Sequence, residues 1–193
     1  MAAESASAVE QTDIVYDIVE VQTEPKRHVF AVLVDNEFGV LARVIGLFSG
    51  RGYNIESLSV AEVEGEKKLS RVTIVTTGND HVIEQIKKLL ERMVPVYQVD
   101  DLTVLGQHVE RELGLIKIIC NHEQRLEALR IANVFRAVVV DTTDTSIVFE
   151  LNSASEKIDA FIKLLAPLGL AEICRTGVAA MSRGTHAVGL GES

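Results

Sequence analysis

The stretch VLVDNEFGVLARVIGLFSGRGYNIESLSV, residues 32–60, decides the fold of this chain of 193 residues. It opens with an apolar run, passes through a polar turn that contains Gly39, and continues with apolar residues at the spacing of one helix face. Gly50 and Gly52 are typical of a helix end, and the residues after them alternate between apolar and polar as in a strand. The stretch therefore predicts a strand, a helix and a second strand in direct succession.

The residues that follow this stretch complete a known pattern of elements. The predicted elements are a strand over residues 28–35, a helix over residues 40–48, strands over residues 53–64 and 69–78 joined by a turn at residues 65–68, a helix capped by Asn79 and Asp80, and a strand over residues 94–105. This order is that of a ferredoxin-like α+β fold, in which an antiparallel sheet carries both helices on one face.

The second half of the sequence repeats the same order. The predicted elements are a strand over residues 113–120, a helix over residues 122–135, a pair of hairpin strands over residues 136–143 and 145–152, a helix over residues 155–169 and a strand over residues 171–181. The repeat indicates a second ferredoxin-like domain directly after the first.

The chain is therefore expected to contain two consecutive domains. Residues 28–105 form the first domain and residues 106–184 the second, with the joint near residues 106–112. Residues 1–27 are an acidic arm and residues 185–193 a tail. In each predicted sheet the helices cover one face and leave the other open, so we expect the open faces and edges to be covered by oligomerisation.

The composition excludes several classes of partner. The formal net charge is -9, and the sequence lacks the clustered Lys and Arg residues that neutralise nucleic-acid phosphates. No window reaches the roughly 20 consecutive apolar residues of a membrane-spanning helix, and the first residues, MAAESASAVEQTD, lack the features of a secretory signal. We therefore expect a cytoplasmic protein that binds neither nucleic acid nor membrane. Cys120 and Cys174 lie far apart in strand-like runs, so we expect both thiols to be buried and reduced.

The sequence offers no recognisable catalytic machinery. An enzyme would show a nucleophile beside a base, paired carboxylates, or metal ligands at a workable spacing. The histidines are scattered singly, and the glycines of residues 46–52 match neither the dinucleotide-binding nor the phosphate-loop spacing. Acylphosphatase-like catalysis is the enzymatic alternative on this fold, but the sequence has no glycine-rich phosphate loop with an Arg after the first strand. We expect no catalytic residue, no bound cofactor and no metal site in this chain.

The polar turn before the first helix is typical of a small-ligand cradle. Unpaired N–H groups at a helix start favour an anion such as a carboxylate, and Gly39 lets the backbone approach a ligand closely. Asn36 and Asn54 offer amide groups that can hold an ammonium. The apolar residues beside these groups are Phe38, Val40, Leu41 and Ile55. Together they suggest a free amino acid with a small branched side chain; the alternative, which composition alone favours, is that Asn36 and Gly39 only form a turn and a helix cap.

Four segments in one order identify a family that this sequence resembles. They are DNEFGVLARVIGLFSGRGYNIESLSV (35–60), LSRVTIVTTG (69–78), HVERELGLIKI (108–118) and RTGVAAMSRG (175–184). Together they closely resemble the regulatory small subunits of acetolactate synthase, also called acetohydroxyacid synthase, over residues 28–184. The resemblance implies that residues 28–105 form an ACT domain and that residues 106–184 form a second ferredoxin-like domain, which activates the catalytic subunit.

The resemblance also implies a regulatory role without activity of its own. In this family the partner is a large catalytic subunit that carries thiamine diphosphate, FAD and magnesium. That subunit condenses two pyruvates to acetolactate, or pyruvate with 2-oxobutyrate, at the first common step of valine, leucine and isoleucine synthesis. The small subunit raises this activity and confers feedback inhibition by valine. The alternative function is a free-standing amino-acid sensor of another pathway or of transcription.

The resemblance further implies a valine site shared by two chains. Family members form homodimers through their ACT domains, and valine lies between the first strand-helix loop of one chain and the second strand of the other. The matching residues here are Asn36, Gly39, Val40 and Leu41 on the loop, and Asn54 with Ile55 on the strand. Phe38 departs from the family, which often has a small residue or proline there, so the choice among valine, isoleucine and leucine stays open.

Overall fold

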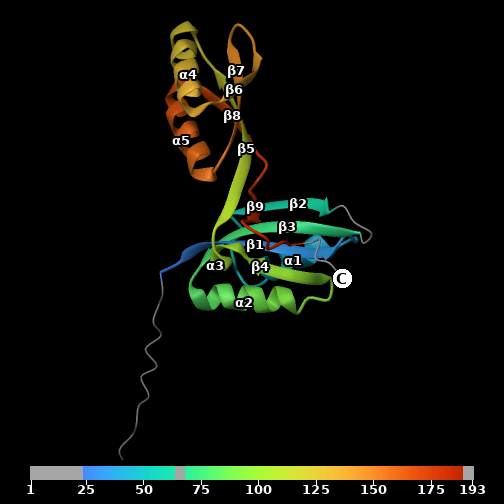
Figure 1. Cartoon of the computed structure of the whole chain (residues 1–193). Coiled ribbons are helices and arrows are strands. Elements are labelled where there is room, and N and C mark those ends of the chain that lie inside the picture. Colours follow the sequence, from blue (N-terminus) through green and yellow to red (C-terminus); the bar gives the residue numbers. More distant parts are fainter. Residues whose placement is uncertain (1–23, 64–67, 189–193) are drawn as a thin grey trace, which may run out of the picture.

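The computed structural model describes residues 24–63 and 68–188. The acidic arm (1–27), the turn over residues 65–68 and the tail (185–193) lie wholly or partly outside these ranges, so the predictions made for them stay predictions. The described residues form two α+β domains. Strand β5 (His108–Ile119) runs from one domain into the other, as Figure 1 shows.

The first domain has the predicted order of elements. Its elements are β1 (Lys26–Asp35), α1 (Val40–Ser49), β2 (Ser57–Val63), β3 (Leu69–Gly78), α2 (Asp80–Glu91) and β4 (Val96–Asp101). The strands lie in the order β2-β3-β1-β4, and each neighbouring pair is antiparallel. This arrangement confirms the predicted ferredoxin-like fold.

The side chains of β1 alternate between the two faces of the first sheet, and both helices cover one of these faces. Phe30, Val32 and Val34 belong to a buried cluster that includes residues of both α1 and α2. Val29 and Ala31, which alternate with Phe30 and Val32 in the sequence, belong to a separate buried cluster. Successive side chains of a strand point to opposite faces, so β1 is buried on both sides of the sheet.

The second domain repeats this topology. Its elements are β5, α4 (His122–Phe135), β6 (Val138–Thr142), β7 (Ser146–Ser153), α5 (Ser155–Leu165), a short 3-10 helix η1 (Ala166–Leu168) and β8 (Leu170–Arg175). The strands lie in the order β6-β7-β5-β8, and the core gathers around Phe149 and Phe161, whose rings meet edge to face. The second ferredoxin-like domain is therefore confirmed as well.

Two boundaries within the first domain differ from the sequence prediction. The sequence predicts one strand over residues 94–105, but β4 ends at Asp101 and a short helix α3 (Leu102–Leu105) follows. The carboxylate of Asp101 accepts a hydrogen bond from the Thr103 amide, which starts this helix. The sequence also predicts that the second strand starts at residue 53, but β2 begins only at Ser57.

Near the predicted joint between the domains, at residues 106–112, strand β5 begins at His108 and continues without a break into the second domain. Its first half pairs with β9 (Ala179–Ser182), and its second half pairs with β7 and β8. The single strand predicted over residues 171–181 is accordingly divided into β8 and β9, with residues 176–178 between them.

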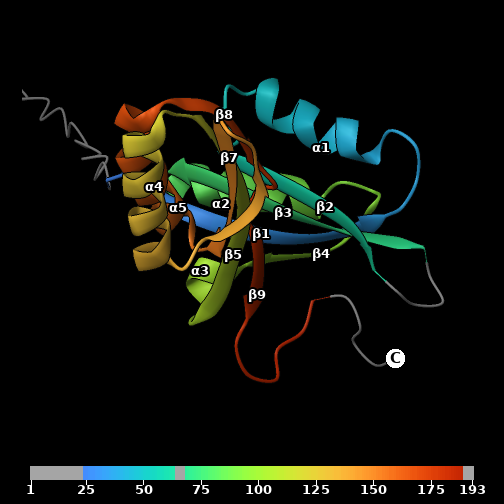
Figure 2. The same ribbon diagram turned by 90° about the horizontal axis from the view of Figure 1, so that it is seen from above.

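The outer face of the first sheet, opposite the helices, is covered by the chain itself. Val178 and Ala180 pack against Val29, Ala31 and Val75 on this face. Figure 1 shows β9 above the first sheet and α2 below it, and Figure 2 looks down on the same sheet from above. The expectation that an open face of the first sheet requires oligomerisation is therefore wrong for this face, because the sequence pattern does not show which part of a chain returns to cover a sheet.

Candidate functional site

Three hydrogen bonds hold the loop between β1 and α1 in place. The amide of Asp35 donates to the carbonyl of Pro95 at 2.9 Å, and the amide of Asn36 donates to the carbonyl of Lys68, also at 2.9 Å. The hydroxyl of Tyr97 donates to a carboxylate oxygen of Asp35 at 2.8 Å. Neighbouring strands therefore fix the position at which the chain turns into α1.

Gly39 gives the loop a helix start without a side-chain cap. It is the N-cap of α1 with φ 82°, in the left-handed region, where a β-carbon is strained. The first α-helical bond runs from the Arg43 amide to the Gly39 carbonyl at 3.0 Å. A β-carbon on Gly39 would have no atom of the described chain within 4 Å. The Val40 amide donates to the Glu37 carbonyl at 3.4 Å, and the next two amides of the first turn have no acceptor within the helix, which suits the carboxylate of a ligand.

The apolar residues of the predicted site divide between the core and the surface. Val40 is buried with the core cluster of the first domain, so its side chain does not line the open loop. Leu41 is 38% exposed, and Phe38 and Ile45 are also exposed. Three large apolar side chains on and before α1 thus form an exposed apolar patch, a feature typical of an interaction surface.

One chain does not bring the two halves of the predicted site together. Asn54 and Ile55 follow the C-terminal end of α1, whereas Asn36 and Gly39 precede its start. A helix of ten residues is about 15 Å long. The carbonyl of Asn54 accepts a hydrogen bond from Thr76 at 2.7 Å, and Ile55 packs against the core of the first domain. A ligand that contacts both halves must therefore lie between two chains.

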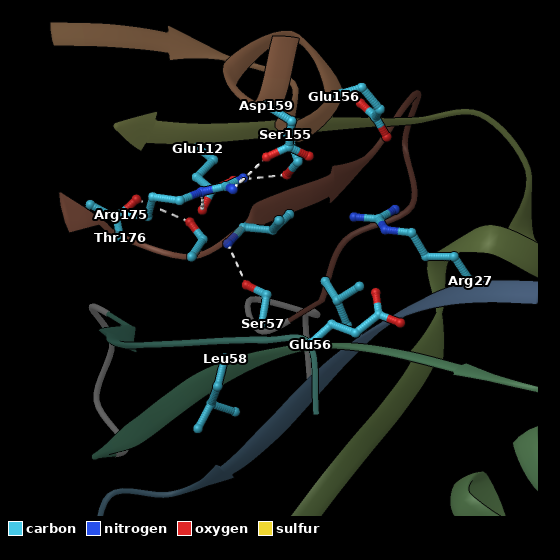
Figure 3. A pocket seen from close by; sticks show the side chains of 13 residues that line it. Arg27, Glu56, Ser57, Leu58, Glu112, Ser155, Glu156, Asp159, Arg175 and Thr176 are labelled. Carbon is cyan, nitrogen blue, oxygen red and sulfur yellow. Dashed lines mark hydrogen bonds and ion pairs between the residues drawn. The ribbon is translucent and has the colours of Figure 1, made fainter. Parts of the chain in front are cut away.

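A cavity of about 580 Å³ lies where the two domains meet, and the sequence analysis did not find it. Figure 3 shows Glu112, Arg175, Ser155 and Asp159 together on one side of this junction cavity, with Glu56, Ser57 and Leu58 on the other. These residues come from the loop before β2, from β2, from β5, from the start of α5 and from the end of β8.

Glu112 is the most buried charge at this junction. It is 5% exposed and accepts hydrogen bonds from Arg175 Nε at 2.9 Å, Arg175 Nη2 at 2.6 Å and Ser155 Oγ at 2.8 Å. The third guanidinium nitrogen of Arg175, Nη1, donates to Asp159 at 2.6 Å. On β5, Glu112 lies on the same face as Gly114, Ile116 and Ile118, all of which are buried. A charged residue at a buried position of a strand is unusual, and this feature of the sequence would have revealed the cluster.

The hydrogen bonds at the junction outweigh the cost of burying these carboxylates. Burial alone would raise the pKa of Glu112, but the hydrogen bonds from Arg175 and Ser155 lower the pKa below its ordinary value. The pKa of Glu110 is lowered chiefly by its hydrogen bonds from Arg27, which are 2.9 and 2.6 Å long. Because Arg27 belongs to β1 and Glu110 to β5, this pair ties the first sheet to the strand shared by both domains.

The described residues show no metal-binding group. Within residues 24–63 and 68–188, no three side chains of His, Cys, Asp or Glu are placed to hold a metal ion. No helix in that part of the chain is long and apolar enough to cross a membrane. Cys120 is buried as expected, but Cys174 is exposed, because β8 lies at an edge of the second sheet.

Comparisons with known proteins point to the same family for both halves of the chain. A family model described as "Small subunit of acetolactate synthase" matches residues 111–184, and one described as "AHAS small subunit-like ACT domain" matches residues 30–98. The acetolactate synthase small subunit of Aquifex aeolicus is 47% identical over 159 residues, which is 82% of this chain and 82% of the relative. The isozyme 3 small subunit of Escherichia coli is 44% identical over 159 residues, which is 82% of this chain and 96% of the relative.

A solved structure agrees with these matches. The crystal structure of an acetolactate synthase small subunit from Thermotoga maritima superposes with a TM-score of 0.75 and 37% sequence identity. The superposition covers 83% of this chain and 99% of that chain. The similarity therefore extends over both domains.

Proposed function

Because the chain belongs to the family of acetolactate synthase small subunits, which are regulatory subunits of branched-chain amino-acid biosynthesis, we propose that it activates a large catalytic subunit and confers feedback inhibition by L-valine. The partner would be the acetolactate synthase large subunit, which condenses two pyruvates to acetolactate and carbon dioxide. Thiamine diphosphate, FAD and magnesium would be bound by that large subunit, and this chain would supply no ligand to them.

The observation that carries the proposal is the open helix start at Gly39. A carboxylate placed there would accept hydrogen bonds from the first-turn amides of α1 and would gain from the helix dipole. Asn36 is exposed beside these amides and would bind the amino acid with its side-chain amide. Leu41 would contact the branched side chain, while Val40, which is buried, would support the loop from below.

The second half of the site would come from another copy of the chain. Asn54 and Ile55 lie about one helix length away from Gly39 in the same chain, so the homodimer would bring the partner's copies of these residues to the loop. The exposed side chains of Phe38, Leu41 and Ile45 support this arrangement, because a second chain would remove them from water. Valine would then stabilise one arrangement of the dimer by binding across it.

Reconstitution with the large subunit of the same organism tests this proposal. We expect acetolactate formation to rise severalfold when the chain is added, and we expect L-valine, but not D-valine, to reduce the added activity. Coupling between two binding sites typically changes the affinity at either site by about 5- to 150-fold. If acetolactate formation by the large subunit does not change when the chain is added, the proposal is contradicted. A free-standing amino-acid sensor would then be the better interpretation.

A further inference from the structure

Six residues connect the second domain to strand β2, and all of them are packed or hydrogen-bonded. We define the coupling segment as residues 175–180, which leave β8 at Arg175 and reach the outer face of the first sheet at Val178. Ser57 and Ser59 of β2 hold both backbone groups of Val178. The hydroxyl of Ser57 accepts from the Val178 amide at 2.8 Å, and the hydroxyl of Ser59 donates to the Val178 carbonyl at 2.7 Å.

Gly177 allows the coupling segment to touch β2 directly. Its φ is 81°, and a β-carbon at this position would lie 3.0 Å from the Leu58 carbonyl oxygen and 3.0 Å from Ser57 Oγ. The first contact is with backbone, which has little freedom to move away. A side chain at Gly177 would therefore separate the segment from β2 as well as strain its own backbone.

The other end of the coupling segment is fixed to the second domain. Arg175 bonds to Glu112 on β5 and to Asp159 on α5. The amide of Thr176 donates to the Leu113 carbonyl at 3.1 Å, and its hydroxyl accepts from the Leu113 amide at 3.2 Å. A shift of β2 relative to β5 must therefore strain or break these bonds, or move the second domain.

Strand β2 is well placed to respond to a ligand. It is an edge strand of the first sheet, paired only with β3, and it starts three residues after Asn54 and two after Ile55. A ligand that contacts Asn54 and Ile55 would act on β2 through a short piece of backbone. Figure 3 shows Ser57 at the border of the junction cavity, on the side opposite Glu112 and Arg175.

We propose that the coupling segment transmits the state of the effector site to the second domain, with Ser57, Ser59 and Gly177 as its positioning residues. This inference rests on the proposed function, because it assigns the regulatory path of that site. The three residues hold the segment on β2 and do not touch the ligand. Weakening their contacts leaves the effector bound and interrupts its effect on the catalytic subunit.

The test separates binding from regulation in the full-length chain. L-valine affinity is measured by calorimetry on the small subunit, and valine inhibition is measured after reconstitution with the large subunit. The double variant Ser57→Ala with Ser59→Ala removes both hydroxyls, and the variant Ser57→Thr with Ser59→Thr keeps them. We expect the alanine pair to bind L-valine within about twofold of the wild type but to need at least tenfold more valine for inhibition, and we expect the threonine pair to restore inhibition.

Gly177→Ala provides an independent variant. Its matched control is Gly184→Ala, because Gly184 has φ 82° but open space where a β-carbon would stand. We expect Gly177→Ala, and not Gly184→Ala, to reduce valine inhibition while valine still binds. Should the alanine pair unfold, Ser59→Ala alone is measured in its place.

Two outcomes overturn the inference. Unchanged inhibition in a folded alanine pair would show that the segment does not carry the signal. A loss of valine binding in the alanine pair would place the serines in the effector site itself. A wild-type chain that neither binds valine nor responds to it would overturn the proposed function, and the inference with it.

Discussion

Replacing Gly39 with aspartate is expected to abolish valine inhibition while the chain still activates the large subunit. The aspartate side chain would enter the open space at the start of α1, where we place the carboxylate of valine. Two like charges about 4 Å apart repel by about 4 kcal/mol at an effective dielectric constant of about 20. This repulsion corresponds to a loss of roughly three orders of magnitude in valine affinity. Calorimetry with L-valine and inhibition of the reconstituted enzyme both measure the effect.

Gly39→Asn is the matched control for this variant. Asparagine has nearly the shape of aspartate and also tolerates a positive φ, but it carries no charge. We expect Gly39→Asn to weaken valine binding much less than Gly39→Asp does, because it lacks the repulsion. If valine still inhibits the Gly39→Asp variant, the effector site does not lie at this loop.

Replacing Glu112 with alanine is expected to have the largest effect on stability. The variant removes a carboxylate that is 5% exposed and leaves Arg175 with only Asp159 as a charged partner. Breaking a buried ion pair costs about 3–5 kcal/mol, and the partial exposure of Arg175 places the expected loss near the lower end, at about 3 kcal/mol. For a chain of this length that loss lowers the melting temperature by roughly 6–12 °C.

An exposed glutamate serves as the control. Glu172 is 4.0 Å from Lys117, and its side chain is 71% exposed, so Glu172→Ala should change stability by less than about 1 kcal/mol. Thermal unfolding followed by circular dichroism compares the two variants. Equal melting temperatures for Glu112→Ala and the wild type would mean that the junction network contributes nothing to stability.

The same network predicts how stability depends on pH. The pKa values of Glu110 and Glu112 are lower in the folded chain than the ordinary value of 4.5. A lowered pKa stabilises the folded state above the unfolded pKa, and this contribution is lost as the pH falls through the folded pKa. The wild type should therefore lose stability below about pH 4.5, and Glu112→Gln, which cannot ionise, should lose less over the same range. Parallel curves of stability against pH for the wild type and Glu112→Gln would contradict this prediction.

Local patterns in the sequence predict most of the fold. The apolar run of β1 and the helical spacing of residues 40–48 define the first domain, and Gly50 is the C-cap of α1 as its position predicts. Asn79 accepts a hydrogen bond from the Val82 amide and so caps α2, again as predicted. These features depend on residues that are close in the sequence, so periodicity and capping rules find them.

Features that depend on distant segments are less visible in the sequence. The outer face of β1 is covered by Val178 and Ala180, and Glu112 is paired with Arg175, which lies 63 positions later. Periodicity indicates that a face is apolar but does not identify the segment that covers it. The candidate site is affected in the same way: the sequence identifies Gly39 and its loop, whereas the distance from Gly39 to Asn54 is apparent only in the fold.

The melting temperature of the purified chain with and without L-valine tests the central claim most directly, with D-valine and L-alanine as controls. L-valine at about 100 times its dissociation constant should add roughly 2.7 kcal/mol to the stability of the folded state and raise the melting temperature by about 5–10 °C. We expect a rise of this size with L-valine, none with D-valine and little with L-alanine. An equal melting temperature in all four samples would contradict the claim that this chain forms a branched-chain amino-acid site.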